Sequence, residues 1–333
     1  NFVNDAGHAE NGVYALRANY GFDGMTIESL RGFRGIDSKL TGHGESHLNP
    51  EGVLLSNGPL SSSVAQAQGL AIADKMAGRD RVTVITVSDG AAMEGEAKEA
   101  FAAIPGQAKK GLVNPFVLVL SDNNTKLSGR ITEDAFDMTP SFEAMETLGW
   151  RVVKIDNGHD LQAVYSALES AVADAKGDST RPICLWVKTI KGYGIKATEE
   201  NAAGGHGFPL KNGEKAIDWV NEIYGGNPPE AILAWAQELR TAWESAEEAK
   251  KSAAPAAAKA PSSKVQAGLA NGAIAAAKEG IPVFSISSDV QGSTGMSAFQ
   301  KSFDDRALEV GIAEANMVSV GAGISKGGYV TIV

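Results

Sequence analysis

The amino-acid sequence predicts an α/β protein built on a doubly wound parallel sheet. Apolar, β-branched runs alternate with segments of helical periodicity, which is the pattern of βαβ units. The runs at 82–87 and 116–120 are almost continuously apolar, as expected for strands that helices cover on both faces. The composition changes to Ala, Pro, Lys and Ser near residue 250, and a second, similar α/β pattern begins after that point.

The expected elements follow one another along the chain. In the first part, strands are predicted at 82–87, 116–120, 150–155 and 182–188, and helices at 94–110, 160–175 and 228–249. After the change in composition, a helix is predicted at 264–279, a strand at 283–287, a helix at 312–325 and a strand-like run at 329–333.

These patterns predict two domains joined by a linker. Residues 1–249 form the first domain, and residues 250–263 have the composition of a partly extended linker. Residues 264–333 form the start of a second domain, which is too short for a complete doubly wound unit. Because the sequence begins without Met and stops in a strand-like run, we expect it to be part of a longer protein.

The composition indicates a globular protein and argues against two classes of partner. With 43% hydrophobic residues, the chain of 333 residues can bury a core, and its net charge of −10 disfavours nucleic acid as a partner. No apolar run reaches the ~18 residues of a membrane span, and we expect no signal peptide. The single cysteine, Cys184, lies in an apolar run and is expected in the core, which fits a reducing, cytoplasmic location.

Polar residues follow two successive predicted strands. Asp89 and Gly90 come after the first strand, and Asn123 follows the second. Ligands of open α/β sheets bind beyond the carboxyl ends of the strands, so these residues are expected at one sheet edge. A carboxylate, a carboxamide oxygen and a backbone carbonyl, for which Thr125 is the candidate, suit Mg²⁺ or Ca²⁺ together with phosphate oxygens. Gly90 would let backbone N–H groups approach a diphosphate at a helix start.

The alternative is that Asp-Gly and Asn-Asn are only turn residues between strands and helices. Their pairing at two successive strand ends favours the metal and diphosphate site. The sequence contains no P-loop and no Gly-x-Gly-x-x-Gly after a strand, which argues against two common nucleotide-binding folds.

Three of the five histidines directly follow a glycine: His8, His43 and His206. Any one of them could be a buried structural histidine. Three in glycine-lined turns indicate side chains presented at a cleft, where an imidazole can exchange protons near neutral pH.

Several motifs, in this order along the chain, resemble those of the transketolase family. Asp89-Gly90 with Asn123 resembles the family's thiamine-diphosphate motif, which has Gly where this chain has Ser88. The segments SNGPL at 56–60, DGAAMEG at 89–95, KTIKGYG at 188–194 and GHGFPL at 205–210 are similar to the family's TTGPL, DGxxxEG, KTIIGFG and SHGAPL. VGIAE at 310–314 resembles the segment that holds the family's conserved glutamate.

The resemblance implies the thiamine-diphosphate-binding fold, and a homodimer with the cofactor between the first domain of one subunit and the second domain of its partner. It implies that Glu314 hydrogen-bonds the aminopyrimidine ring, and that His8, His43 and His206 contact substrate and shuttle protons. The cofactor-binding residues that it implies are Gly58, Leu60, Asp89, Gly90, Glu94, Asn123, Lys188, His206, Asp289 and Glu314. It assigns Ser293, with the three histidines, to the substrate. Glu94 and Glu99 are expected on one helix face and resemble carboxylates of the dimer interface.

The expected reaction is transfer of a two-carbon ketol unit from a ketose phosphate to an aldose phosphate, a step of the pentose phosphate pathway. Ser263 stands where the family has a phosphate-binding arginine, which weakens the assignment of ordinary sugar phosphates. The alternatives are 1-deoxyxylulose-5-phosphate synthase or another thiamine-diphosphate enzyme, a non-catalytic fragment or split subunit, and a flavodoxin-like binding domain.

Overall fold

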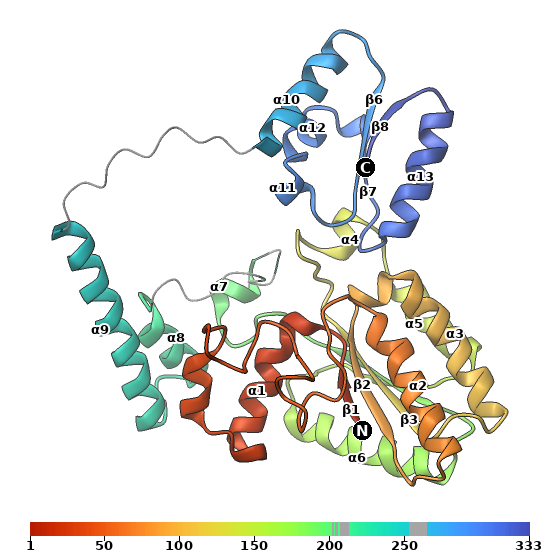
Figure 1. Ribbon diagram of the computed structural model, residues 1–333, viewed down its shortest axis with the longest axis vertical. Helices are drawn as coiled ribbons and strands as arrows, with labels where there is room; N and C mark the ends of the chain where they lie inside the picture. Colours follow the sequence, from red (N-terminus) through yellow and green to blue (C-terminus); the bar gives the residue numbers. More distant parts are fainter. Residues whose placement is uncertain (202, 204–205, 207–212, 253–264) are drawn as a thin grey trace. The chain divides into compact units, whose positions relative to one another are not determined.

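The structure is a computed structural model that describes residues 1–201, 203, 206, 213–252 and 265–333 (Figure 1). The chain divides into two compact units. Unit 1 comprises Asn1–Asn124, Ile131–Thr189 and Val310–Asn316, and unit 2 comprises Thr125–Arg130, Ile190–Glu309 and Met317–Val333. Residues 253–263 of the predicted linker lie outside the described residues, and the domain division at 250–263 stays a prediction.

Unit 1 is built on a five-stranded sheet in which all paired strands are parallel. Its order is β1-β2-β3-β5-β4. The strands are β1 (Phe2–Asn4), β2 (Thr83–Ser88), β3 (Phe116–Asp122), β4 (Arg151–Ile155) and β5 (Ile183–Lys188). The parallel α/β class is therefore confirmed, and the four strands predicted in this part of the chain lie within two residues of their expected bounds.

Helices cover both faces of this sheet. They are α2 (Ser62–Met76), α3 (Gly95–Lys109), α5 (Thr139–Leu148) and α6 (Leu161–Gly177). Helix α1 (Glu10–Asn19) packs instead on the 3₁₀ segment Ile27–Gly32, and the short α4 (Ile131–Asp134) adds Ile131 to the core. Successive strand residues point to opposite faces, so Leu118 and Leu120 of β3 pack with α2, α3 and α5. Val117 and Val119 of the same strand pack with α6 on the other face. This alternation explains why the strands read as continuous apolar runs.

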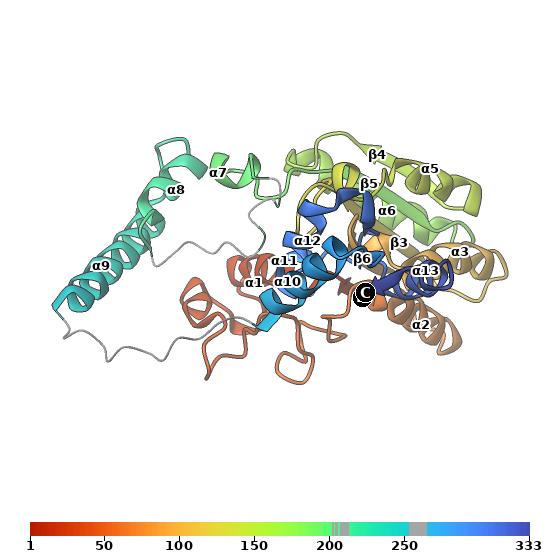
Figure 2. The ribbon, with the colours of Figure 1, turned by 90° about the horizontal axis from the view of Figure 1, so that it is seen from above.

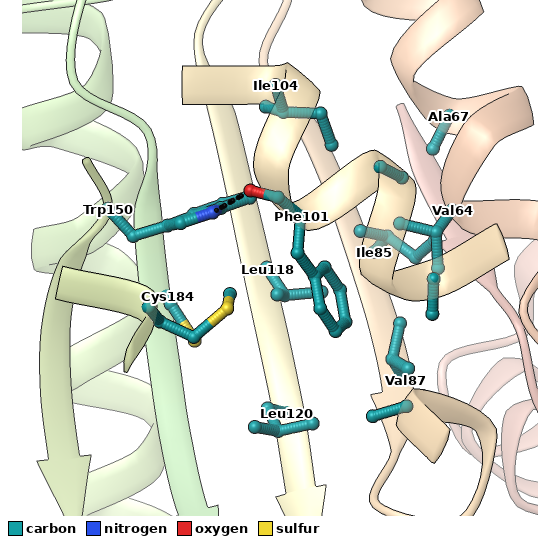
Figure 3. Packing of buried hydrophobic residues seen from close by; sticks show 14 of the residues in the cluster. Val64, Ala67, Ile85, Val87, Phe101, Ile104, Leu118, Leu120, Trp150 and Cys184 are labelled. Carbon is teal, nitrogen blue, oxygen red and sulfur yellow. Dashed lines mark hydrogen bonds between the residues drawn. The ribbon is translucent and has the colours of Figure 1, made fainter. Parts of the chain in front are cut away.

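The larger core of unit 1 lies between the sheet and helices α2, α3 and α5 (Figure 3). Trp150 is fully buried there, and its indole N–H donates a 2.8 Å hydrogen bond to the carbonyl of Phe101 in α3. That carbonyl is available because the residue four positions on is Pro105, which has no N–H to donate within the helix. Cys184 is fully buried, as predicted, and burial raises the pKa of its thiol to about 12.

Unit 2 contains a second, smaller parallel sheet of order β7-β6-β8. Its strands are β6 (Val283–Ser287), β7 (Ala307–Glu309) and β8 (Val330–Ile332). The helices in this part are α10 (Val265–Lys278), α11 (Gln291–Thr294), α12 (Ser297–Ser302) and α13 (Glu314–Lys326), whose residues from Met317 belong to unit 2. A core formed by α10, α12 and β6 confirms the predicted second α/β pattern.

Unit 2 also holds α7 (Lys196–Glu199), α8 (Ala216–Ile223) and the long helix α9 (Glu230–Ser252). Figure 2 shows α8 beside α9, and the two helices contact each other. The helix predicted at 228–249 therefore exists, shifted by two to three residues at its ends. Among the described residues, no helix is both long and apolar enough to cross a bilayer.

Substitution of Ile104 tests the packing of the core beneath α3. Its side chain is fully buried in the cluster that joins α3 to the sheet, so Ile104→Ala should lower the free energy of unfolding by about 2–5 kcal/mol through lost burial and a residual cavity. Met76→Ala at the exposed end of α2 should change it by about 0.5 kcal/mol or less. Urea unfolding followed by far-ultraviolet circular dichroism compares the two, and equal losses would contradict this packing.

Candidate functional site

The carboxyl end of β2 carries a buried carboxylate. Asp89 is 1% exposed, and its two carboxylate oxygens accept hydrogen bonds from the backbone N–H groups of Gly90 at 2.9 Å, Asn123 at 2.8 Å and Asn124 at 2.6 Å. Strands β2 and β3 pair in parallel, with Ser88 opposite Ser121, so the residues that follow them meet at one edge. The predicted juxtaposition of Asp89 and Asn123 is therefore present in the structure.

Burial raises the pKa of Asp89 to about 6, and the nearby Asp122 carboxylate adds to the effect while the three backbone N–H donors oppose it. Asp122 in turn accepts hydrogen bonds from the Trp186 indole at 2.7 Å and from Lys188 Nζ at 2.5 Å. Lys188, predicted to bind the cofactor, thus lies at the same end of the sheet, on strand β5 next to β3.

Gly90 follows Asp89 in ordinary helical backbone geometry. A Cβ at this position would lie 3.0 Å from Cδ1 of Ile312, so the absence of a side chain admits the segment that precedes Glu314. The N–H of Gly90 donates to Asp89 in this structure. Gly311 is packed still more tightly, because a Cβ there would lie 2.0 Å from Cε of Met93.

Two carboxyl groups meet within unit 1. Glu94 precedes helix α3, Glu314 is the first residue of α13, and the Glu314 carboxyl lies close enough to act on Glu94. Burial, followed by the Glu314 carboxyl, raises the pKa of Glu94 to about 8. Glu94 therefore favours its protonated form at neutral pH. Glu99, which was expected to share a helix face with Glu94, is an exposed residue of α3, while Glu94 lies before the helix.

His8 and His43 lie near a network centred on Asn57. A Cβ at Gly7 would fall 2.5 Å from Cδ2 of His43 and 2.6 Å from Oδ1 of Asn57, so only glycine allows this approach. Asn57 accepts a hydrogen bond from the N–H of Gly44 at 2.7 Å. It also donates to the buried carboxylate of Glu10 at 3.0 Å. Both histidines are exposed, as expected for side chains presented to a ligand.

The loop that carries the predicted residues Gly58 and Leu60 is held by Asp5. This fully buried carboxylate accepts hydrogen bonds from the backbone N–H groups of Ser61 at 2.9 Å and Ser63 at 3.2 Å, at the start of α2. Burial raises the pKa of Asp5 to about 6. Ser61 has a left-handed backbone with φ of 72°, a strained geometry that the Asp5 hydrogen bond helps to maintain.

Asp5, Glu10 and Asn57 were not predicted as site residues. Asn57 stands inside the SNGPL segment, but its role and that of Asp5 depend on contacts between residues more than fifty positions apart along the chain. Burial of a polar residue between apolar elements is the signal that would have identified them.

Four of the predicted site residues belong to unit 2. The hydroxyl of Thr125 accepts a hydrogen bond from Arg130 at 2.6 Å, and Ser293 is exposed and donates to the Val290 carbonyl at 3.1 Å. The imidazole Nδ1 of His206 lies 2.6 Å from Lys191 Nζ, and burial together with this cation lowers the pKa of His206.

Asp289, the fourth, is buried, and both its carboxylate and its backbone N–H form hydrogen bonds. Its carboxylate accepts hydrogen bonds from Lys126 Nζ at 2.9 Å and from the backbone N–H groups of Leu127 at 2.6 Å and Ser128 at 2.9 Å. Its own N–H donates to Glu309 at 2.8 Å, and its φ of 61° is in the left-handed region. Asp289 thus fastens the loop of residues 125–130 to the end of β6.

Two family models match this chain. Residues 1–271 match the family model described as transketolase, thiamine diphosphate binding domain, and residues 263–333 match transketolase, pyrimidine binding domain. The transketolase of Nostoc sp. is 33% identical over 246 residues, covering 70% of this chain and 35% of the relative. That of Rhodobacter capsulatus is 34% identical over 252 residues, covering 73% and 34%.

Solved structures show the same fold. A transketolase variant from Pichia stipitis in complex with fructose 6-phosphate matches with a TM-score of 0.57 and 23% identity, over 97% of this chain and 54% of that one. The transketolase from Leishmania mexicana matches with a TM-score of 0.55 and 22% identity, over 93% and 52%. The parallel sheet and the two family models together define an α/β protein with a thiamine-diphosphate-binding domain. The chain belongs to the transketolase family, as the motifs indicated, and spans about a third of the length of these curated relatives.

The Glu94–Glu314 pair predicts a pH dependence of stability. Because the folded-state pKa of Glu94 is raised from 4.5 to about 8, the folded protein keeps a proton that the unfolded chain loses. This group's contribution to stability is therefore full below pH 4.5 and falls as pH rises toward about 8. In Glu94→Gln that fall should be absent, so urea midpoints measured from pH 5 to 8 should decline less than in the wild type. Parallel declines would contradict the raised pKa of Glu94.

Proposed function

We propose that this chain is part of a thiamine-diphosphate-dependent transketolase, which moves a two-carbon ketol unit from a ketose phosphate to an aldose phosphate. Membership of the transketolase family supports the reaction class. The observation that carries the proposal is the buried Asp89 carboxylate at the carboxyl ends of β2 and β3. Asp89 belongs to the part of the chain that matches the family model for thiamine diphosphate binding.

The donors at this edge suit Mg²⁺, with Ca²⁺ as the alternative. Asp89 offers a carboxylate next to the buried carboxamide oxygen of Asn123, and both are hard oxygen ligands. Within the described residues, no group of three or more His, Cys, Asp or Glu side chains could hold a metal by itself. This donor set fits a magnesium ion that takes its remaining ligands from Thr125, phosphate oxygens and water. A cation here would also offset the cost of ionising Asp89.

The remaining roles follow the family resemblance. When bound, thiamine diphosphate supplies the electron sink for carbon–carbon bond cleavage. We propose that Glu314 hydrogen-bonds its aminopyrimidine ring and that the exposed His8 and His43, with His206, bind substrate hydroxyls and move protons. The residues proposed to contact the cofactor in addition to Asp89, Asn123 and Glu314 are Gly58, Leu60, Gly90, Glu94, Lys188, His206 and Asp289.

The chemistry of His206 supports a role near anionic groups. Its lowered pKa keeps the imidazole neutral near pH 7, and the adjacent Lys191 supplies positive charge. Ser293 is proposed to contact the substrate phosphate. We further propose a cytoplasmic homodimer acting in the pentose phosphate pathway, with the cofactor between the first domain of one subunit and the second domain of its partner.

Asp89→Ala tests the metal site. Because a carboxylate ligand and its hydrogen bonds are removed, Mg²⁺-dependent thiamine diphosphate affinity, measured by titration calorimetry on the full-length protein, should fall by about 100-fold or more. In the wild type the affinity should also weaken below about pH 6, where Asp89 becomes protonated. Asp89→Asn keeps the size of the side chain and one acceptor oxygen, and serves if the alanine variant does not fold.

The exposed Asp178 provides a matched control, since Asp178→Ala removes an aspartate far along the sequence from either strand end. It should bind the cofactor as the wild type does. Wild-type affinity in both folded Asp89 variants would contradict the assignment.

A ketol-transfer assay on the full-length protein tests the reaction. With xylulose 5-phosphate and ribose 5-phosphate, glyceraldehyde 3-phosphate should appear only when thiamine diphosphate and Mg²⁺ are both present. Glu314→Gln should bind the cofactor but lose turnover by about 100-fold or more, because an ionisable group at the ring is lost. Release of CO₂ from pyruvate, or no ketol transfer by cofactor-loaded protein, would contradict the proposed activity.

A further inference from the structure

A polar cluster of unit 1, formed by Asn4, Glu10 and Asn57, lies beside the turn that carries His43. Glu10 is 2% exposed and Asn57 is 7% exposed. Oε2 of Glu10 accepts hydrogen bonds from the side-chain amides of Asn4 at 2.8 Å and Asn57 at 3.0 Å. Glu10 is also the first residue of α1, where the helix N-terminus favours a negative charge. The cluster is therefore built around a buried carboxylate.

This carboxylate sets the orientation of the Asn57 side-chain amide. A carboxylate only accepts hydrogen bonds, so the NH₂ group of Asn57 must face Glu10. The same NH₂ group donates to the carbonyl of Asn4 at 2.8 Å. The amide oxygen of Asn57 therefore points the other way, where it accepts from the N–H of Gly44 at 2.7 Å. A reversed amide would place two acceptors together at Glu10 and two donors together at Gly44.

The peptide bond between His43 and Gly44 is held at both of its polar groups. Its N–H donates to Asn57, and its carbonyl accepts from the hydroxyl groups of Thr41 at 2.5 Å and the buried Tyr14 at 3.3 Å. The backbone N–H of Asn57 also donates to the carbonyl of Gly44 at 3.0 Å. The backbone at His43 is therefore fixed, while its side chain is exposed.

Glycine at two positions lets Asn57 contact the turns of both histidines. A Cβ at Gly44 would lie 3.1 Å from Nδ2 of Asn57. A Cβ at Gly7, which precedes His8, would lie 2.6 Å from Oδ1 of Asn57. Asn57 also directly precedes Gly58, where the segment proposed to contact the cofactor begins. One buried side chain thus joins three segments that the proposed function requires.

We propose that Asn57, oriented by Glu10, is a positioning residue that fixes the His43 imidazole for the substrate. Asn57 acts through the backbone of the His43 turn and not by contact with the reacting atoms. The proposal rests on the proposed function, in which His43 binds substrate hydroxyls and moves protons. A displacement of about 1 Å in such a group can lower a rate by about 100-fold.

Hydrogen exchange of the full-length protein without cofactor, followed by mass spectrometry, tests the positioning. In Asn57→Ala the N–H of Gly44 loses its buried acceptor, so a peptide covering residues 41–48 should exchange faster by about tenfold or more. Peptides from β3 should exchange as in the wild type, because the change is local. Asn11→Ala, which removes an exposed asparagine of α1, should leave both regions unchanged.

A double-mutant cycle tests whether Asn57 acts through His43. In the ketol-transfer assay, Asn57→Ala should lower kcat/KM by about tenfold or more. In a His43→Ala background the same substitution should cost about twofold or less, because the imidazole that it positions is gone. A general structural role would give the same loss in both backgrounds.

An exchange of the two polar groups tests the role of Glu10, and serves if Asn57→Ala does not fold. Asn57→Asp keeps an acceptor for Gly44 but places a second carboxyl group against Glu10, so kcat/KM should fall by about tenfold. Adding Glu10→Gln returns an NH₂ donor between the two positions and should restore most of this loss. Adding Glu51→Gln instead, at an exposed position, should restore none of it.

Three results would overturn the positioning role. They are wild-type exchange at 41–48 in folded Asn57→Ala, an equal kinetic loss with and without His43, and no rescue of Asn57→Asp by Glu10→Gln. Absence of ketol transfer by the wild type would instead overturn the proposed function, and with it the part of this turn in turnover. The exchange measurement would still decide whether Asn57 holds the turn.

Discussion

Three backbone N–H groups converge on the Asp89 carboxylate, and the arrangement of the sheet edge depends on this interaction. One donor comes from the residue after Asp89 and two come from the turn after β3, so a single side chain ties together the ends of two neighbouring strands. Hydrogen bonds to a charged acceptor contribute about 1.5–3 kcal/mol each. Desolvation opposes this gain, as the raised pKa of Asp89 shows, and a bound cation would shift the balance toward the ionised form.

A similar use of buried carboxylates recurs in both units. Asp5 accepts from the backbone at the start of α2, and Asp289 accepts from the backbone of the loop at 125–130. In each case an acid at a strand end fixes a segment distant in sequence. The proposed cofactor residues therefore stand on segments whose positions are set by hydrogen bonds as well as by apolar packing.

Much of the fold could be predicted, because continuous apolar strands such as β3 carry a strong signal when both faces are covered. The strand-end pairing of Asp89 and Asn123 was predictable for the same reason. The three-residue strands β1 and β7 are too short to show periodicity, and α2 packs through small residues such as Ala67 and Ala71, which weakens its amphipathic pattern.

The side-chain contacts of the candidate site were harder to predict from the sequence. The contact between Glu94 and Glu314 joins residues more than two hundred positions apart, and local spacing suggested Glu99 as the neighbour of Glu94 instead.

The buried position of Cys184 has a consequence for the dynamics of the protein. Its thiol is the only one in the chain and lies in β5, opposite Leu118 of β3 and Val152 of β4. A thiol reagent can reach the sulfur only after these strands separate or the helices above them lift. The rate of its modification under native conditions therefore measures how often the centre of the sheet opens, with no introduced label and no competing site on this chain.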